Sequence, residues 1–424
     1  MRSKHLRRML AVCAALVMVA AACGGDDDGD TTSTTLAADT TEAPSEEPEP
    51  GTDDFELVIG RVMPETGSAA FLNSPMIVSI DLALQDIRDA GGNVRMLTGD
   101  SATDPDVAPE TVNRLLAEGA HVIVGAASSG VSQSFIQTLY DAQIPQCSPS
   151  NTSPSFSTQQ NAAFYFRTVP PDQAAALILS NIVAADGATN VAIPARADDW
   201  GNALAELLAD NFDELGVNYE IFSYDEDAAS YDPTVSAIEA MGADAVVLIT
   251  FSEGAQIIRG LLEAGIPPGA MYGSDGIYDL HLPTTVDPTN PNSLDGFVAV
   301  AAGGSDEFST ELSSMTDGNV IYGGQSYDCV IVLALAALAA GSTDGPAIIE
   351  QVLSLTSGGE KCHSYAECAE LIAQGVDIDY DGISGPLELD EVGDPRFGRY
   401  LIAEFIDGEF TVIDSQDADL AELG

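Results

Sequence analysis

The chain has 424 residues, of which 45% are hydrophobic and 19% charged, a composition typical of a globular protein. Its formal net charge of −53 at pH 7 excludes nucleic acid as a partner, because phosphates are bound by Lys and Arg. We interpret the acidity as a general surface property that favours solubility, not as a binding feature.

The N-terminal residues predict export from the cytoplasm. Basic residues within the first eight positions precede an apolar run at 9–22, which is shorter than the roughly 20 residues that span a membrane. Small residues then lead into Cys23, so residues 1–22 have the parts of a secretory signal peptide. The placement of Cys23 resembles a bacterial lipobox, which implies that this cysteine is lipidated; an ordinary signal peptide is the alternative.

Residues 23–54 form the next segment, which has one leucine, no aromatic residue and many Asp, Glu, Thr and Pro. Such a stretch buries too little apolar surface to offset its ordering entropy, so we expect a disordered acidic tether. Like charges keep it extended. A lipid and a spacer together predict a domain anchored to the outer face of the cell membrane.

From residue 55 onward, short apolar strands alternate with helical segments. In the first set, the expected strands cover residues 55–62, 93–100, 121–126, 144–150 and 164–170. The helices expected between them cover residues 77–90, 109–118 and 131–142. This alternation of β-branched runs, bounded by Gly and Pro, indicates a parallel sheet covered on both faces.

A second set of the same pattern begins after Pro170 and Pro171. Its expected strands cover residues 190–195, 218–224, 244–250 and 270–276. Its expected helices cover residues 173–184, 200–215, a stretch through Ile238, and 253–264. Two such sets predict an α/β protein of two doubly wound, Rossmann-like lobes.

The last part of the chain must join one lobe or the other. It contains a strand at 296–304, a helix at 326–341 that is apolar nearly all round and therefore buried, and a hairpin turn at Asp407-Gly408. The lobe boundaries that we expect are lobe 1 at 55–169, lobe 2 at 170–295, a return to lobe 1 at 296–375, and C-terminal strands at 376–424, mostly in lobe 2 or the hinge. Several chain crossings would make a hinged cleft between the lobes.

The cysteines beyond the tether divide into two pairs. Cys362 and Cys368 are close in sequence and outside the cytoplasm, which predicts a local disulfide. A zinc site is the rival interpretation, but the spacing does not match the short-pair zinc patterns, and we expect no metal. Cys147 and Cys329 either pair or remain two buried small hydrophobes, and the sequence leaves both readings open.

Candidate ligand-binding residues follow the expected strands, because open parallel sheets bind ligands at the carboxyl ends of their strands. Ser128 and Ser129 follow one strand, and Ser150 and Thr152 follow the next. Their hydroxyl and backbone N–H groups lie where helix dipoles favour an anion such as a small carboxylate. The alternative is that these residues only cap helices and form turns.

The second set supplies an acid and aromatic side chains. Asp275 at a strand end could accept an ammonium group, or it is simply part of a Ser-Asp-Gly turn. Trp200, the single tryptophan, together with Phe71 and Tyr327, could line the cleft or belong to the core. Hydroxyl groups on one lobe and an acid on the other describe a site for a small zwitterion, with no cofactor.

Several stretches carry a family resemblance. They are IGRVMPETGSAA, VIVGAASSGVS, IPQCSPSNTSP, FYFRTVPPDQAAA, YGSDG, GGQSYDCVIVLALA and DIDYDGISGPLELDEVGDP. The chain resembles the extracytoplasmic solute-binding proteins of branched-chain amino acid ABC transporters, which have the type I periplasmic binding protein fold. The last stretch, with CHSYAEC before it, is similar to the actinobacterial lipoprotein branch of that family.

The resemblance implies a role for each candidate residue. Ser129 matches the serine that holds the ligand carboxylate, and Ser150 with Thr152 matches contacts to the carboxylate and the amine. Asp275 falls where the family carries an acid for the ammonium group. The resemblance also implies a monomer that binds a branched-chain or other amino acid, an amide or a small carboxylate, and delivers it to an ABC permease.

Two further positions follow from the same resemblance. Phe71 and Tyr327 match positions that line the pocket. The loop 251–253 matches a segment where many relatives supply an aromatic contact, and an acid at Glu253 would depart from the family pattern.

An enzyme is the first rival class. The sequence has four histidines, and it contains neither a Gly-x-Ser-x-Gly elbow nor a His-Glu-x-x-His pattern. We therefore expect no enzymatic activity. A ligand-sensing receptor module of the same fold is the second rival. We expect the ligand to be captured by hinge closure of the two lobes.

Overall fold

The computed structural model describes residues 55–422; the expected signal peptide, Cys23 and the whole expected tether lie outside the described residues. The first sheet is parallel, in the order β2-β1-β3-β4-β5. Its strands are β1 (Leu57–Met63), β2 (Val94–Asp100), β3 (Val122–Gly125), β4 (Gln146–Ser148) and β5 (Tyr165–Arg167). All seven residues of β1 are buried, as expected for an interior strand of a parallel sheet covered on both faces.

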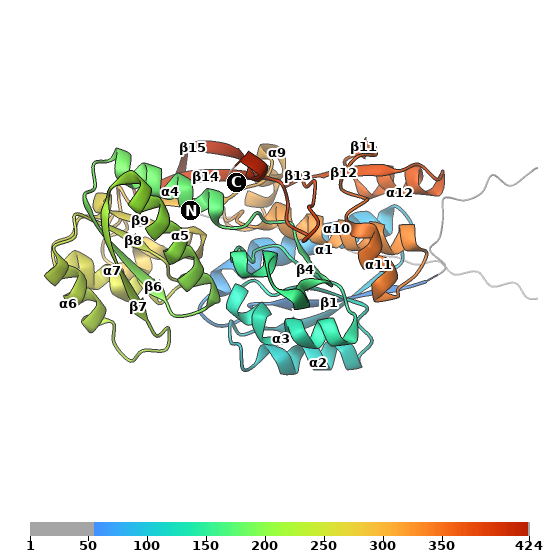
Figure 1. The fold of residues 1–424 in the computed structure, drawn as a ribbon, viewed down its shortest axis with the longest axis horizontal. Helices are drawn as coiled ribbons and strands as arrows, with labels where there is room; N and C mark the ends of the chain where they lie inside the picture. Colours follow the sequence, from blue (N-terminus) through green and yellow to red (C-terminus); the bar gives the residue numbers. More distant parts are fainter. Residues whose placement is uncertain (1–54, 423–424) are drawn as a thin grey trace, which may run out of the picture. The chain divides into compact units, whose positions relative to one another are not determined.

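Helices cover both faces of this sheet. They are α1 (Asn73–Asp89), α2 (Ala108–Ala117), α3 (Ser129–Ala142) and α10 (Gly323–Ala340). Helices α2 and α3 lie on one face and share a core with Val62 and Ile123 of the sheet, whereas α1 and α10 pack together on the other face (Figure 1). We call this sheet with its helices lobe 1.

The second sheet has the order β15-β14-β10-β9-β8-β6-β7, and β6 to β10 are parallel. Its strands are β6 (Asn190–Arg196), β7 (Asn218–Tyr224), β8 (Ala245–Leu248), β9 (Met271–Gly273), β10 (Val298–Ala302), β14 (Phe397–Ile406) and β15 (Glu409–Asp419). Its helices are α4 (Gln173–Ala185), α5 (Asp199–Leu215), α6 (Asp232–Met241), α7 (Gly254–Glu263) and α8 (Leu282–Val286). We call this unit lobe 2, and the predicted class of two doubly wound α/β lobes is confirmed.

The chain crosses between the two lobes close to the expected boundaries, except that it returns to lobe 1 later than expected. It leaves lobe 1 after β5 and enters lobe 2 with α4, close to the expected position. The return was expected from residue 296, but β10 belongs to lobe 2, because it pairs with β9 on one side and β14 on the other. The return therefore begins after Ala302, and the hairpin of β14 and β15 completes lobe 2.

The returning segment builds the second face of lobe 1. It contains α9 (Asp306–Ser313), α10 and α11 (Gly345–Val352). Within residues 55–422, α10 is the one helix long and apolar enough to span a membrane, but 83% of that stretch is buried inside the protein. It is a core helix, as the sequence predicts.

A small third sheet and two disulfides complete the described chain. The sheet has the order β11-β12-β13 and lies beside α12. Its elements are β11 (Glu360–Cys362), α12 (Tyr365–Ala373), β12 (Ile378–Gly382) and β13 (Gly385–Pro386). Cys362 pairs with Cys368, which confirms that prediction, and Cys147 of β4 pairs with Cys329 of α10, which answers the question that the sequence left open.

Short 3-10 helices lie in the loops. They are η1 (Ala70–Leu72), η2 (Pro154–Ser157), η3 (Gln160–Ala162), η4 (Pro268–Ala270), η5 (Asp275–Ile277) and η6 (Leu420–Glu422). The first, second and fifth of these position residues at the carboxyl ends of the two sheets, where the candidate site lies.

Candidate functional site

A small cavity lies between the carboxyl ends of the two sheets. Its walls come from both lobes and from the segments between them, and we call it the interlobe cavity. It is lined by Leu72, Ala127, Ser128, Ser129, Ser150, Thr152, Trp200, Phe251, Asp275, Gly276 and Tyr322. The space between these side chains is about 10 Å³, which by the same measure is about what one water molecule needs.

The lobe 1 wall consists of uncharged hydrogen-bonding groups. Ser128 and Ser129 lie at the N-terminus of α3, and the Ser128 side chain makes no capping hydrogen bond there. The first N–H groups of a helix have no partner within the helix, so this end can donate to an anion. The Ser150 hydroxyl donates to the carbonyl of Ala127 at 3.0 Å, which fastens the loop after β4 to the loop after β3.

The lobe 2 wall consists of a stacked aromatic pair backed by an arginine. Trp200 at the start of α5 stacks on Phe251, with ring centroids 4.9 Å apart and planes 7° apart. The Arg196 guanidinium lies over the Phe251 ring at 4.1 Å, and it is itself held by Asp198 at 2.6 Å and Glu253 at 3.0 Å. Glu253 therefore pairs with Arg196 and is not one of the cavity's acids.

One buried carboxyl group, Asp275, lines the cavity, and a second, Asp172, donates its backbone N–H to the carbonyl of Thr152 at 2.9 Å. Asp275, the first residue of η5, is 8% exposed and accepts a hydrogen bond from the Tyr322 hydroxyl. Burial raises the pKa of Asp275 above its ordinary value. Asp172, directly before α4, is 2% exposed, and burial together with the Asp275 charge raises its pKa well above the ordinary value.

Hydrogen bonds join the two lobes close in sequence to residues that line this cavity. The Ser155 hydroxyl of lobe 1 donates to Asp199 of lobe 2 at 2.9 Å. The backbone N–H of Ser252 in lobe 2 donates to the carbonyl of Ser68 in lobe 1 at 3.2 Å. A ligand larger than water can therefore enter only if the lobes separate or the lining side chains move.

The structure brings most of the sequence-predicted site residues to one place. The predicted residues that line the interlobe cavity are Ser128, Ser129, Ser150, Thr152, Trp200 and Asp275. Phe71 does not line it; its carbonyl accepts from Asn319 at 3.0 Å, and the neighbouring Leu72 faces the cavity instead. Tyr327 donates to Asp86 at 2.6 Å and packs against Phe308, inside lobe 1.

Five lining residues were not among the predicted ones: Leu72, Ala127, Phe251, Gly276 and Tyr322. Phe251 lies in the loop that the family resemblance marks as an aromatic position, so that signal could have found it. Tyr322 precedes Gly323 with a φ of 58°, a left-handed conformation that few non-glycine residues adopt and that no sequence pattern announces.

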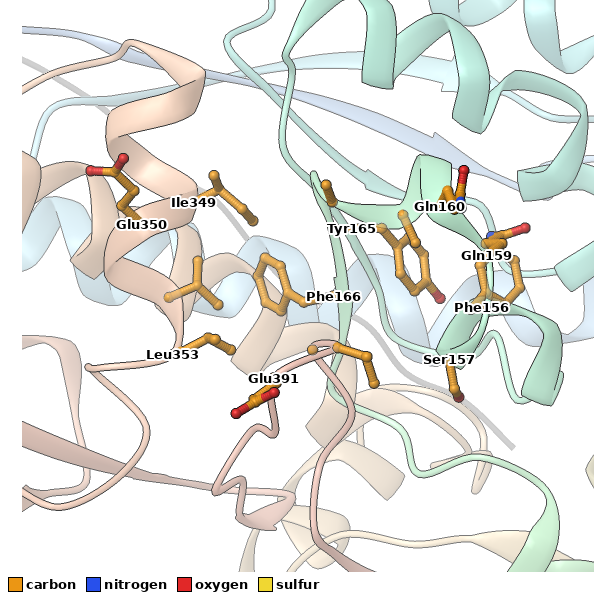
Figure 2. A pocket seen from close by; sticks show the side chains of 15 residues that line it. Phe156, Ser157, Gln159, Gln160, Tyr165, Phe166, Ile349, Glu350, Leu353 and Glu391 are labelled. Atoms are coloured by element: carbon orange, nitrogen blue, oxygen red, sulfur yellow. The ribbon is translucent and has the colours of Figure 1, made fainter.

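A second hollow lies on lobe 1, away from the cleft residues (Figure 2). Figure 2 shows Phe166 facing Ile349 of α11 and Leu353 directly after it, whereas Tyr165 points toward Phe156. Its walls are mostly apolar, and the charged residues in them, Glu350 and Glu391, are exposed. Ligand pockets need converging polar groups that fix orientation, and the interlobe cavity meets this requirement better.

Comparisons with known proteins agree with this geometry. A family model described as periplasmic binding protein matches residues 56–360. The Leu/Ile/Val-binding protein homolog 1 of Brucella melitensis is 23% identical over 373 residues, which is 84% of this chain and 93% of the relative. An amino acid binding protein of Pseudomonas aeruginosa is 27% identical over 240 residues, 54% of this chain and 63% of the relative.

Solved structures share the fold at low sequence identity. The leucine binding protein LivK of Thermotoga maritima gives a TM-score of 0.72 at 17% identity, covering 85% of this chain and 98% of that one. LivJ of Streptococcus pneumoniae, in complex with isoleucine, gives 0.69 at 16%, covering 86% and 99%. A solute-binding protein of R. palustris in complex with benzoate gives 0.68 at 15%, covering 85% and 96%. The chain thus belongs to the periplasmic binding protein family, whose members bind solutes outside the cytoplasm and are not enzymes.

Proposed function

We propose that this protein captures a small amino acid, or a related amide or carboxylate, in the interlobe cavity and delivers it to the permease of an ABC importer. One observation carries the proposal: uncharged donors of lobe 1 and the buried carboxyl group of Asp275 in lobe 2 line the same cavity. This polarity suits a zwitterion, whose carboxylate and ammonium need partners of opposite character. The relatives named for leucine, isoleucine and valine support the same ligand class.

Capture follows from the contacts of the two walls. The N-terminus of α3, with Ser129, and the loop with Ser150 and Thr152 hold the ligand carboxylate on lobe 1. Asp275 accepts the ammonium group, and the Trp200 ring covers the ligand side chain. Because a ligand contacts both walls only when the lobes are together, binding favours the closed arrangement, which then docks on the permease.

The same proposal places the protein at the membrane. Lipidation of Cys23 would hold a monomer at the outer face of the cell membrane, and the acidic tether would let it reach a permease. Labelling of cells with a fatty-acid analogue tests this: wild-type protein should carry the label and the Cys23→Ala variant should not.

Ligand identity is tested with the chain lacking its signal peptide. A thermal-shift panel of amino acids, amides and aromatic acids should show at least one amino acid or amide that raises the melting temperature. Calorimetric titration of that compound should then show weaker binding for Ser129→Ala and for Asp275→Ala. Ser134→Ala, in α3 but outside the cavity, is the matched control and should bind as wild type. No shift across the panel, or unchanged binding in both cavity variants, would contradict the proposal.

A further inference from the structure

Arg196 is the last residue of β6, which lies between β8 and β7 in the lobe 2 sheet. The three strands are parallel, so the loops that follow them meet at one edge of the sheet, and each loop places one acid on the Arg196 guanidinium. Nε binds Asp198 of its own loop at 2.6 Å, and Nη1 binds Glu253 of the loop after β8 at 3.0 Å. Nη2 lies 3.5 Å from Glu226 of the loop after β7, so one side chain ties three loops together.

The link to Glu253 fixes the position of Phe251. The same Glu253 oxygen that binds Arg196 accepts from the backbone N–H of Phe251 at 3.1 Å. The Tyr224 hydroxyl is its third donor, at 3.0 Å. The Phe251 ring itself packs against both the Arg196 guanidinium and the Trp200 ring. The arginine thus holds Phe251 directly and through the loop that carries it.

The link to Asp198 fixes the position of Trp200. Asp198 is the N-cap of α5: its Oδ1 accepts from the backbone N–H of Gly201 at 2.7 Å, while its Oδ2 binds Arg196. Trp200 lies in the first turn of this helix, two residues after Asp198. The direction in which α5 starts, and with it the place of the Trp200 ring in the cavity wall, therefore depends on the Asp198 carboxylate.

The same two loops carry contacts to lobe 1. Asp199 in the loop after β6 accepts from the Ser155 hydroxyl at 2.9 Å. Ser252 in the loop after β8 donates its backbone N–H to the carbonyl of Ser68 at 3.2 Å. Asp199 and Ser252 each directly adjoin an aromatic residue of the cavity wall. Whatever fixes these loops therefore fixes the wall and the lobe contacts at once.

We propose that Arg196 is a positioning residue that holds the aromatic wall of the cavity and the lobe 1 contacts beside it as one rigid unit. The guanidinium suits this role because Nε and Nη1 of its planar fork bind separate acids while its face packs on the Phe251 ring. Lysine would keep the charge but cannot make these contacts together, since its ammonium is a single point on a flexible stem. The inference rests on the proposed function only in taking the interlobe cavity as the ligand site, and its test needs no ligand.

Trp200 is the single tryptophan and is 3% exposed, so its fluorescence reports on the wall. In the ligand-free chain lacking its signal peptide, Arg196→Lys should move the emission of Trp200 to longer wavelength. The acrylamide quenching constant should rise about twofold or more, because the stacked pair opens more often once the loops are no longer tied. Asp198→Asn, which keeps a good N-cap but loses the carboxylate that binds Arg196, should change both quantities in the same direction.

A core variant of the same lobe separates positioning from a general loss of stability. Phe405 of β14 is fully buried, and β10, β9 and β8 lie between β14 and β6 in the sheet. Phe405→Ala leaves a cavity in the core and should lower the melting temperature at least as much as Arg196→Lys does. It should leave the emission and the quenching of Trp200 as in wild type. If Phe405→Ala changes them as much as Arg196→Lys does, Arg196 contributes only to stability and the proposal is wrong.

Hydrogen exchange tests the link to the lobe contacts. The peptide that spans residues 250–255 contains the amides of Phe251 and Ser252, which donate to Glu253 and to lobe 1. Its exchange, followed by mass spectrometry, should be about tenfold faster or more in Arg196→Lys than in wild type, and unchanged in Phe405→Ala. Wild-type exchange or wild-type Trp fluorescence in folded Arg196→Lys would overturn the proposal, since the charge alone would then suffice.

These failures differ from failure of the proposed function. Fluorescence and exchange are measured without ligand, so they decide the role of Arg196 whether or not an amino acid binds. The thermal-shift panel decides the proposed function whether or not Arg196 positions the wall.

Discussion

Replacement of Cys147 and Cys329 by alanine should destabilise the protein more than any other pair of cysteine changes. Both side chains are fully buried, and their disulfide joins β4 of lobe 1 to α10, residues separated by 182 positions. It therefore holds the returning segment against the sheet that the chain left before building most of lobe 2. Cys362 and Cys368, separated by 6 positions, provide an internal control.

The expected magnitudes follow from the length of chain that each disulfide closes. By lowering the conformational entropy of the unfolded chain, the Cys147–Cys329 bond should raise the free energy of unfolding by about 5 kcal/mol. The Cys362–Cys368 bond, which closes a much shorter loop, should raise it by about 2 kcal/mol. The difference of about 3 kcal/mol is large beside a total stability of about 5–15 kcal/mol for a folded protein.

Guanidinium unfolding monitored by circular dichroism measures both losses. The protein lacking the Cys147–Cys329 bond should unfold at a clearly lower denaturant concentration than the protein lacking the Cys362–Cys368 bond. Both should keep the wild-type spectrum in buffer. Equal losses for the two variants, or a larger loss for the short loop, would refute the reasoning from chain entropy.

Three further outcomes are expected. Arg196→Met should lower the free energy of unfolding by about 3–5 kcal/mol, because it leaves buried acids without their cation. Arg95→Met, at an exposed ion pair, should lower it by less than about 1 kcal/mol. Denaturant titration measures both changes. Burial, followed by the Arg95 charge, lowers the pKa of His121 below 6.5, so the unfolded chain binds that proton more readily. Stability relative to a His121→Gln variant should therefore fall as pH drops below about 6.5, measured by urea unfolding at pH 7.5 and 5.5. Trp200 is the single tryptophan, so the titration of a bound amino acid should change its fluorescence with the same midpoint as the calorimetric heat; no change would place the ligand elsewhere.

Alternating strands and helices made the architecture predictable, and the elements that escaped prediction are those without that signal. The strands at β1, β3, β6 and β8 are apolar runs between turn residues, and each lies where its pattern predicts. Short polar elements such as α9 and β11 have neither a long period nor an apolar face to reveal them. Lobe membership of β10 depended on its pairing partners, which an isolated strand sequence does not contain.

Site residues that directly follow strands were predictable from the sequence, and those on other segments were not. Ser129, Ser150 and Asp275 follow strands, and the geometry of parallel sheets brings such positions together whatever the rest of the chain does. Tyr322 reaches the cavity from the residue directly before α10, so its position depends on how the returning segment folds onto lobe 1. Tyr327, the aromatic residue of the helix itself, was the more visible choice, but a helix turn of about 100° per residue directs it into the interior of lobe 1.

The buried arginines near the cavity are already paired with acids of the protein, which explains why the ligand should carry both a negative and a positive charge. The structure commits the two deeply buried arginines near the cavity, Arg167 to Asp394 and Arg196 to Asp198 and Glu253. Among the described residues that line the cavity there is no Lys or Arg. A ligand carboxylate must then be held by serine hydroxyls and the α3 N-terminus, which are weaker partners for an anion than an arginine. Such a wall tolerates a carboxylate only if its charge is balanced nearby, and in the function that we propose the ammonium group of the same molecule, paired with Asp275, would supply that balance.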